Sequence, residues 1–185
     1  MKVIAFTGMP GSGKSEAVRI VKERGLQVIR MGDMVWDEVR RRGLELKDSY
    51  VGMVATEMRR IHGPSIWAQR TAKKLAGMRT ETLELDAVVI DGVRNSEEIE
   101  FFKNELGSDF RLVAIHASPK TRYERILARK RDDDDFIGEA SVKNRDFREL
   151  GWGLGSVIAM ADVMIVNEGT IEELAEKVNA ATNVI

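Results

Sequence analysis

The sequence predicts an α/β protein in which helices cover both faces of a parallel β-sheet, as a three-layer sandwich. Short apolar segments alternate with longer amphipathic segments along almost the whole chain, which is typical of strands joined by crossover helices. A length of 185 residues with 43% hydrophobic residues is enough for one domain with a buried core. We therefore expect residues 1–185 to form a single domain.

The expected strands are short and strongly apolar. They cover residues 2–7, 27–30, 87–90, 111–116 and 163–166. The run from Ala87 to Ile90 contains no polar residue and is followed by Asp91. Such a run is typical of a strand that is buried on both faces, so we place it inside the sheet.

The expected helices lie between and after these strands. They cover residues 14–24, 33–42, 48–61, 65–78, 95–106, 119–130, 139–150, 156–161 and 170–181. Gly25 ends the first of them, and Asp33 is expected to cap the second. Asn95 followed three residues later by Glu98 is close to a capping box at the start of the fifth helix. The boundaries are thus indicated by residues that suit helix ends.

Two segments are longer than a connection between strands requires. Residues 31–86 are 56 residues without a good strand candidate, so we expect a helical insertion beside the sheet. Residues 131–155 are polar, charged and contain glycines, which predicts a mobile flap. The first insertion is basic, because residues 33–80 hold ten Lys and Arg against six Asp and Glu. We therefore expect an anionic ligand at this insertion.

The composition excludes several classes of chemistry. With no cysteine, the chain cannot form disulfides, thiolate metal sites or a cysteine nucleophile. No segment approaches the roughly 18 apolar residues that span a bilayer, and the N-terminal segment lacks a signal pattern, so we expect a cytoplasmic protein without a membrane partner. A net charge of -1 provides no general attraction to nucleic acid. The oligomeric state stays open between a monomer and a homodimer.

The strongest motif is glycine-rich and fits G-x-x-x-x-G-K-[S/T] at every fixed position. Its residues are Gly8, Met9, Pro10, Gly11, Ser12, Gly13, Lys14 and Ser15. The motif follows an expected strand and opens an expected helix, as a phosphate-binding loop must. Lys14 would place its charge on the β and γ phosphates, and the Ser15 hydroxyl would bind Mg²⁺. We therefore expect a bound nucleoside triphosphate with Mg²⁺.

Asp91 ends an expected strand at the edge of the sheet where this loop lies. We expect its carboxylate to hold the water shell of the metal, although an aspartate at this position can also simply cap a turn. The chain has no N-K-x-D guanine motif, so an ATP-dependent kinase fits better than a GTP-binding switch. Arg122, Arg125 and Arg129 recur at helical spacing, and they either converge on the γ phosphate or stay solvated beside nearby acids.

Five segments together resemble a known group of proteins. They are the phosphate loop, GDM at 32–34, IDGVR at 90–94, RILARKR at 125–131 and ADVMIVNEG at 161–169. They are similar to the nucleoside monophosphate kinase superfamily and, more closely, to small archaeal P-loop proteins related to adenylate kinase and dephospho-CoA kinase. The resemblance covers nearly the whole chain. It implies the strand order 2-3-1-4-5, an acceptor-binding insertion at 31–86 and a lid at 131–155 that closes over ATP.

The resemblance also implies roles for individual residues. Asp33 would lie on the acceptor-site helix, and Arg94 would contact the acceptor phosphate. Arg129 would resemble the lid-edge arginine beside ATP, so that Lys14, Arg94 and Arg129 form the expected catalytic set. Asn167 would lie in the loop beside adenine. Trp36 stands where adenylate kinase has an arginine, and it either packs or contacts a base or pantetheine group of the acceptor.

The expected function is therefore transfer of a phosphoryl group from ATP, with Mg²⁺, to a small nucleotide-like acceptor. AMP and dephospho-CoA both suit the resemblance. The alternative is a protein that binds and hydrolyses ATP as a switch and acts on a protein or RNA partner, which the basic insertion would also suit. Nucleic acid is not otherwise expected as a partner.

Overall fold

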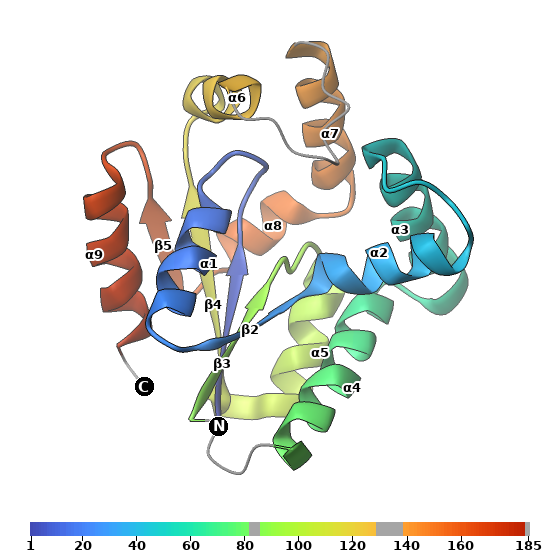
Figure 1. The fold of residues 1–185 in the computed structure, drawn as a ribbon, viewed down its shortest axis with the longest axis horizontal. Coiled ribbons are helices and arrows are strands. Elements are labelled where there is room, and N and C mark those ends of the chain that lie inside the picture. Colours follow the sequence, from blue (N-terminus) through green and yellow to red (C-terminus); the bar gives the residue numbers. More distant parts are fainter. Residues whose placement is uncertain (82–85, 129–138, 184–185) are drawn as a thin grey trace.

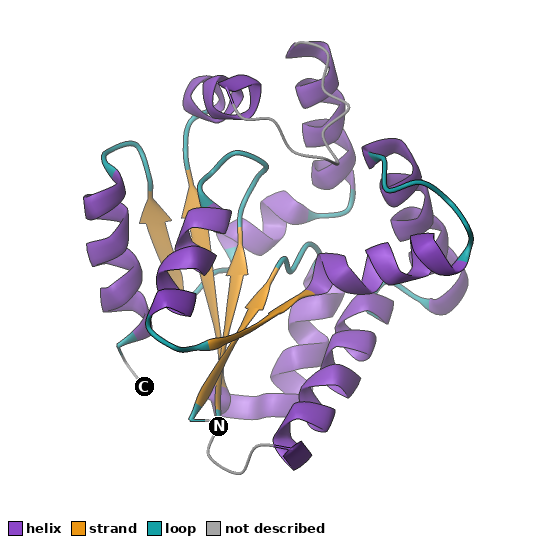
Figure 2. Cartoon of the chain, in the orientation of Figure 1, coloured by secondary structure: helices purple, strands orange, loops and turns teal. Residues whose placement is uncertain are grey.

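A computed structural model describes residues 1–81, 86–128 and 139–183, and its centre is a five-stranded parallel sheet between two layers of helices (Figure 1 and Figure 2). The strands are β1 (Lys2–Thr7), β2 (Gln27–Arg30), β3 (Ala87–Asp91), β4 (Phe110–His116) and β5 (Val163–Val166). They lie in the order β2-β3-β1-β4-β5. This confirms both the predicted class and the predicted strand order.

The register of the sheet brings the ends of three strands together. Asp91, the last residue of β3, lies opposite Phe6 of β1 on one side and Arg30 of β2 on the other. All the paired strands are parallel, so their carboxyl ends meet at one edge. Loops that leave this edge can therefore form a common site.

The helices agree with the predicted ones to within a few residues. They are α1 (Lys14–Glu23), α2 (Met31–Arg41), α3 (Asp48–His62), α4 (Ile66–Glu81), α5 (Ser96–Leu106), α6 (Pro119–Ala128), α7 (Glu139–Gly151), α8 (Leu154–Ala159) and α9 (Ile171–Thr182). A short 3₁₀ turn, η1 (Gly107–Asp109), follows α5. None of the helices in the described ranges is both long enough and apolar enough to cross a membrane.

The predicted cap of α2 was wrong. The helix begins at Met31, directly after β2, with Arg30 in the cap position. Met31 is only 3% exposed, so burial of its side chain fixes the point at which the chain turns from strand to helix. Asp33 consequently lies in the first turn, where its carboxylate faces the positive end of the helix dipole.

The predicted cap of α5 is confirmed. The Asn95 side chain accepts a hydrogen bond of 2.8 Å from the Glu98 backbone N–H. The Glu98 carboxylate accepts in return from the backbone N–H of Arg94, at 2.7 Å, and not from that of the cap residue itself. This exchange fixes the loop that carries Arg94.

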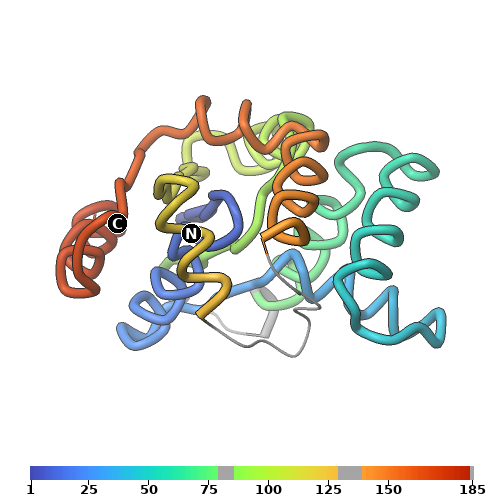
Figure 3. The backbone as a smooth tube through the Cα atoms, turned by 90° about the horizontal axis from the view of Figure 1, so that it is seen from above, coloured from blue at the N-terminus to red at the C-terminus, as the bar shows by residue number. Residues whose placement is uncertain are grey.

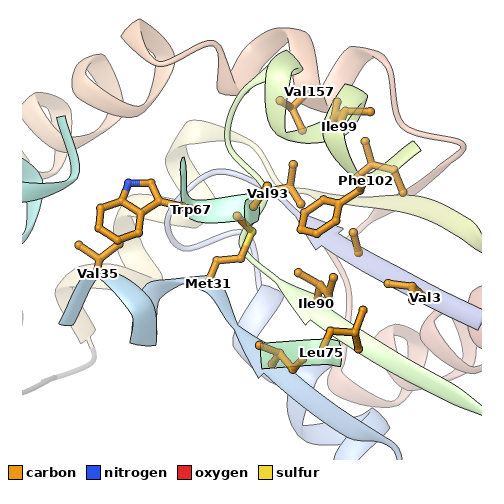
Figure 4. Packing of buried hydrophobic residues seen from close by; sticks show 14 of the residues in the cluster. Val3, Met31, Val35, Trp67, Leu75, Ile90, Val93, Ile99, Phe102 and Val157 are labelled. Carbon is orange, nitrogen blue, oxygen red and sulfur yellow. The ribbon is translucent and has the colours of Figure 1, made fainter. Parts of the chain in front are cut away.

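Two cores lie on the two faces of the sheet, because successive side chains of a strand point to opposite faces. Ile4 and Phe6 of β1 pack toward α1 and α9. Val3 and Ala5 belong to the other core, which α4, α5 and α8 help to form. Figure 4 shows part of this second core, including Trp67. Its packing anchors the 31–86 segment to the sheet.

Helices α3, α6 and α7 stand around the carboxyl edge of the sheet. In Figure 1 and Figure 3, α7 lies between α6 and α3, and the loop from β1 to α1 lies below α6. The described part of the predicted flap, in α7, thus lies beside the predicted insertion, in α3, and next to the phosphate-binding motif (Figure 1 and Figure 3). That the insertion binds the acceptor and the flap closes over ATP stays a prediction.

Candidate active site

The loop between β1 and α1 depends on glycine at two positions of tight contact. Gly13 has φ +100°, and a Cβ atom there would lie 2.0 Å from the Asn167 amide nitrogen. A Cβ on Gly8 would lie 2.3 Å from the backbone oxygen of Ile115. Only glycine allows this backbone path, which turns successive N–H groups toward an anion at the start of α1. The loop therefore fits the phosphates of a nucleotide.

Lys14 and Asp91 meet at the carboxyl edge of the sheet. Lys14 Nζ donates to Asp91 Oδ1 at 2.6 Å, and Arg30 Nε lies 3.8 Å from Asp91 Oδ2. Asp91 is 8% exposed, so both carboxylate oxygens face these cations in a largely dry setting. The pair places a lysine charge directly beside the loop, where incoming phosphate oxygens can compete with Asp91 for it.

The same corner offers suitable ligands for Mg²⁺. The Ser15 hydroxyl and the Asp91 carboxylate are oxygen donors of the kind that this ion prefers. Within the described residues there is no group of three or more His, Cys, Asp or Glu that could hold an ion by itself. A site of this kind suits an ion that keeps several waters and binds mainly to substrate phosphates.

Two clefts meet at this corner. The phosphate-loop cleft encloses about 540 Å³ and is lined by the residues from Gly8 to Glu16 other than Ser12, together with Arg125 and Ile171. That volume lies within the range of small-molecule sites. The narrower side cleft encloses about 90 Å³ and lies among α2, α3 and α7. The residues that line both are Lys14, Ser15, Arg94, Arg145 and Glu149. The two clefts thus adjoin at Lys14.

Glu149 of α7 is the acidic member of this shared boundary. Arg145 Nε donates to Glu149 Oε1 at 3.1 Å, and Arg94 Nε lies 3.8 Å from Glu149 Oε2. Burial raises the pKa of Glu149, but the charges of Arg94, Arg145 and Lys14 outweigh this effect and lower the pKa overall. Glu149 is therefore an anion that balances cations at the meeting point of the clefts.

The insertion and the flap are joined by ion pairs at Asp48, in the first turn of α3. Arg148 Nη2 lies 2.8 Å from Asp48 Oδ2, and Arg145 Nε lies 3.7 Å from Oδ1. Gly52, one turn later, leaves room for Arg148, since a Cβ atom there would come within 2.9 Å of the guanidinium carbon. These contacts hold α7 against α3 over the side cleft.

The predicted residues of the phosphate loop divide into two groups. All of them line the phosphate-loop cleft except Ser12, which is 1% exposed and lies behind it. Asn167 is also buried, and its amide donates to the Ser12 backbone oxygen at 2.9 Å. Asn167 thus supports the loop from behind, and its contact with adenine stays a prediction.

The predicted acceptor residues are also divided. Arg94 lines both clefts, and Trp36 lines the side cleft. Asp33 does not line the side cleft, and its nearest cation is Arg30 at 4.0 Å. Arg129 lies outside the described residues, so its role stays a prediction.

The arginines of α6 have different environments. Arg125 lines the phosphate-loop cleft and donates to the Asn167 backbone oxygen at 3.1 Å. Arg122 is 4% exposed, forms a two-pronged ion pair with Asp146 of α7 and donates to the Pro10 backbone oxygen at 2.8 Å. Arg122 is therefore neither solvated nor on a phosphate, because Asp146 occupies its guanidinium. It ties α6, α7 and the phosphate loop together.

Several residues that line the side cleft were not predicted from the sequence to belong to a site. They are Arg30, Asp48, Arg148, Glu149 and Trp152. Arg145 and Arg148 lie in residues 131–155, which the sequence marks only as polar, charged and glycine-containing, and no motif marks Trp152. The spacing of Arg145, Arg148 and Glu149 on one helix was the available signal, since residues three and four apart share a face.

Comparisons with known proteins show the family of this chain. A family model described as an AAA domain matches residues 7–143. A UPF0200 protein of Methanosarcina barkeri is 45% identical over 172 residues, which are 93% of this chain and 89% of that protein.

Solved structures share the fold at lower identity. TT1252 from Thermus thermophilus has a TM-score of 0.68 at 18% identity and covers 99% of this chain and 96% of its own. A shikimate kinase from Bacteroides thetaiotaomicron has a TM-score of 0.59 at 13% identity, with 98% of both chains covered. The fold is therefore that of P-loop kinases.

Proposed function

The chain belongs to the UPF0200 family and carries an AAA domain, and we propose that it is an ATP- and Mg²⁺-dependent phosphotransferase for a small nucleotide-like acceptor. AMP and dephospho-CoA are the acceptors to test first. The observation that carries the proposal is the pair of clefts that meet at Lys14. A kinase needs two ligands in line on either side of the transferred group, and this arrangement supplies two adjoining spaces.

Positioning and charge are what this chain supplies to such a transfer. ATP would lie in the phosphate-loop cleft, with its phosphates on the backbone N–H groups of the loop and on Lys14. Mg²⁺, when bound at Ser15 and near Asp91, would supply charge neutralisation of the phosphate oxygens. Arg94 and Arg145 line both clefts, so they can stabilise the charge that passes between donor and acceptor.

The acceptor would enter the side cleft between α2, α3 and α7. Arg94 would contact its phosphate, while Trp36 offers an aromatic face on the wall of this cleft. The ion pairs of Asp48 with α7 support a closed arrangement that keeps water from the transferred group. Asp33, Asn167 and Arg129 are assigned roles here only through the resemblance to kinases.

Product analysis tests this proposal. Purified chain is mixed with ATP, Mg²⁺ and one of AMP, CMP, UMP or dephospho-CoA, and ADP and phosphorylated product are followed by ³¹P NMR. We expect ADP and a phosphorylated acceptor in equal amounts. Release of inorganic phosphate with no phosphorylated acceptor would contradict the kinase function and favour the ATP-driven switch.

The Lys14→Ala variant tests the site. Removing the lysine charge should lower turnover by at least about 100-fold, the usual loss when a preorganised charge on the transition state is removed. Lys22→Ala is the matched control, because Lys22 is an exposed lysine on the same helix and should leave turnover unchanged. Circular dichroism checks that both variants fold. Turnover that survives in Lys14→Ala would refute the assignment of the loop.

A further inference from the structure

We propose that the free edge of β5 is a docking site for an extended acidic segment of a partner protein, which adds to the five-stranded sheet as a further strand. Acidic side chains of this segment face α9, and its apolar side chains lie on the opposite face of the sheet. The inference does not depend on the proposed function, because the groove along β5 shares no lining residue with the phosphate-loop cleft or the side cleft.

The two edge strands of the sheet differ in character. β2 carries Gln27 and the charged Arg30. Among the described strands β5 pairs with β4 alone, and its residues Val163–Val166 are all apolar (Figure 1). Charged side chains on an edge strand discourage further pairing, whereas an apolar edge with free backbone groups is a template for another strand. β5 is therefore the edge that is open to addition.

A groove of about 540 Å³ runs along this open edge. Besides the residues of β5, its described lining consists of Arg111 of β4 and of Lys177, Ala180 and Ala181 of α9. The two alanines leave room beside the strand because their side chains are small. The lining holds two cations and no acidic residue. An occupant that complements this groove is therefore narrow and negatively charged on the side of α9.

The two cations lie at the two ends of β5. Arg111 precedes Val113 by two residues, and Val113 lies opposite Val163, the first residue of β5. Lys177 Nζ donates to the backbone oxygen of Val166, the last residue of β5, at 2.9 Å. A strand rises about 3.3 Å per residue, so roughly four or five residues of an extended segment span the distance between the two cations. Two acidic residues on one face of such a segment can therefore meet both.

Both cations have donors available for carboxylates. The guanidinium of the partly buried Arg111 forms no hydrogen bond or ion pair with another described residue. The nearby Asp162 carboxylate instead accepts from the Leu112 backbone N–H at 2.7 Å. Lys177 uses one of its three N–H groups on Val166. The positive charge at each end of the groove is thus free to pair with a ligand.

The two faces of β5 demand an alternating pattern in the added strand. Ile165 lies in the core beside α9, and Val163 packs against the same core. Met164 and Val166 therefore point to the opposite face, where they are 50% and 48% exposed. An added strand meets cations on the α9 face and apolar side chains on the other. A segment in which acidic and apolar residues alternate satisfies both faces.

A second copy of this chain complements the groove less well. Antiparallel pairing of two β5 strands would bring the carboxyl end of one beside the amino end of the other. Lys177 of one copy would then approach Arg111 of the other, so that like charges meet on the α9 face. An acidic segment avoids this repulsion.

Peptide binding tests the proposal. A fluorescent peptide of about seven residues, in which glutamate and valine alternate, is titrated with the full chain and followed by anisotropy. A peptide with lysine in place of glutamate, and one with the same composition in two blocks, should each bind at least about tenfold more weakly. Methylation of every second peptide nitrogen should abolish binding in one register and spare it in the other, because only alternate N–H groups of a strand face its neighbour.

Hydrogen exchange locates the bound peptide. Binding of the alternating peptide should slow amide exchange in residues 163–166 and leave residues 27–30, on the other edge strand, unchanged.

Two variants with matched controls test the side chains. Arg111→Ala should weaken binding by about threefold to thirtyfold, whereas Arg60→Ala, at an exposed arginine of α3, should not. Met164→Glu should weaken binding because it places a carboxylate against the apolar face of the peptide. Met53→Glu is its control, since Met53 is 48% exposed but lies on α3.

Three results would overturn the inference: equal binding of the glutamate and lysine peptides, no slowing of exchange in residues 163–166, or unchanged affinity in both Arg111→Ala and Met164→Glu. A dimer of the chain that Met164→Glu dissociates in sedimentation would also overturn it, because a second copy then occupies the edge. Turnover enters none of these measurements. Failure of the proposed phosphotransfer is therefore distinguishable from failure of this inference.

Discussion

Replacing Gly13 with alanine tests how the phosphate loop is supported from behind. Gly13 adopts φ +100° at the start of α1, and the new Cβ atom would lie 2.0 Å from the Asn167 amide nitrogen. Asn167 must therefore move, and its buried hydrogen bond to the Ser12 backbone oxygen is lost. Gly25→Ala is the matched control, because Gly25 has φ +85° but a Cβ atom there would meet nothing within 4 Å.

The expected magnitude follows from these two contributions. A residue with a Cβ in the left-handed region costs about 1 to 2 kcal/mol, and both variants carry this cost. Gly13→Ala also leaves a buried carbonyl without its donor, which costs about 1 to 3 kcal/mol more. For a chain of this size, about 2 to 4 °C of Tm corresponds to each kcal/mol. We expect Gly13→Ala to melt roughly 2 to 12 °C below Gly25→Ala.

Thermal unfolding followed by circular dichroism measures this difference. A double-mutant cycle with Asn167→Ala separates the clash from the backbone strain, since removing the amide should lower the cost of Gly13→Ala to that of Gly25→Ala. Equal melting temperatures for Gly13→Ala and Gly25→Ala would show that Asn167 does not restrict the side chain at position 13. So would a cycle without coupling between Gly13 and Asn167.

Two further predictions concern buried carboxylates. Glu98→Ala should lower the free energy of unfolding by about 3 to 5 kcal/mol, because it leaves the partly buried Arg59 without its 3.0 Å partner. Glu97→Ala, at an exposed neighbouring position, is the control and should change this free energy by less than about 0.5 kcal/mol. Equal midpoints of urea unfolding for the two variants would contradict the prediction. The hydrogen bond from Arg41, against the opposing effect of burial, lowers the pKa of Glu38 from 4.5 to about 2. A pKa that is lowered in the folded state stabilises the fold at pH values above 4.5, and this contribution is lost as the pH falls toward 2. The measured melting temperature should therefore fall less over this pH range in Glu38→Gln than in the unmodified chain.

The phosphate loop and the strand that ends at Asp91 could be predicted from the sequence because each depends on a few neighbouring residues. When a strand precedes it and a helix follows, this spacing of glycines and Lys14 indicates a phosphate-binding loop. The buried run before Asp91 is equally local. The strand order came from the resemblance to known kinases, and the pairing of the five strands confirms it.

Residues whose role depends on a distant partner could not be read in this way. Arg122 and Arg125 look alike at helical spacing, yet Asp146 occupies Arg122 while Arg125 faces the phosphate-loop cleft. Asp33 looked like a helix cap, but burial of Met31 starts the helix earlier. In each case the deciding contact comes from an element that local pattern does not specify.

Local features of the sequence are enough to predict a phosphate-binding loop on a parallel sheet with a basic helical segment beside it. These features follow from periodicity, glycine spacing and charge, which are properties of adjacent residues. Which cations have a hydrogen-bonded carboxylate partner is visible only in the folded chain. Arg30 and Arg94 come from separate elements and rest on Trp36 and Trp152, while their neighbours bond to carboxylates. Charge balance depends on distances through space, and these arise only when the chain has folded.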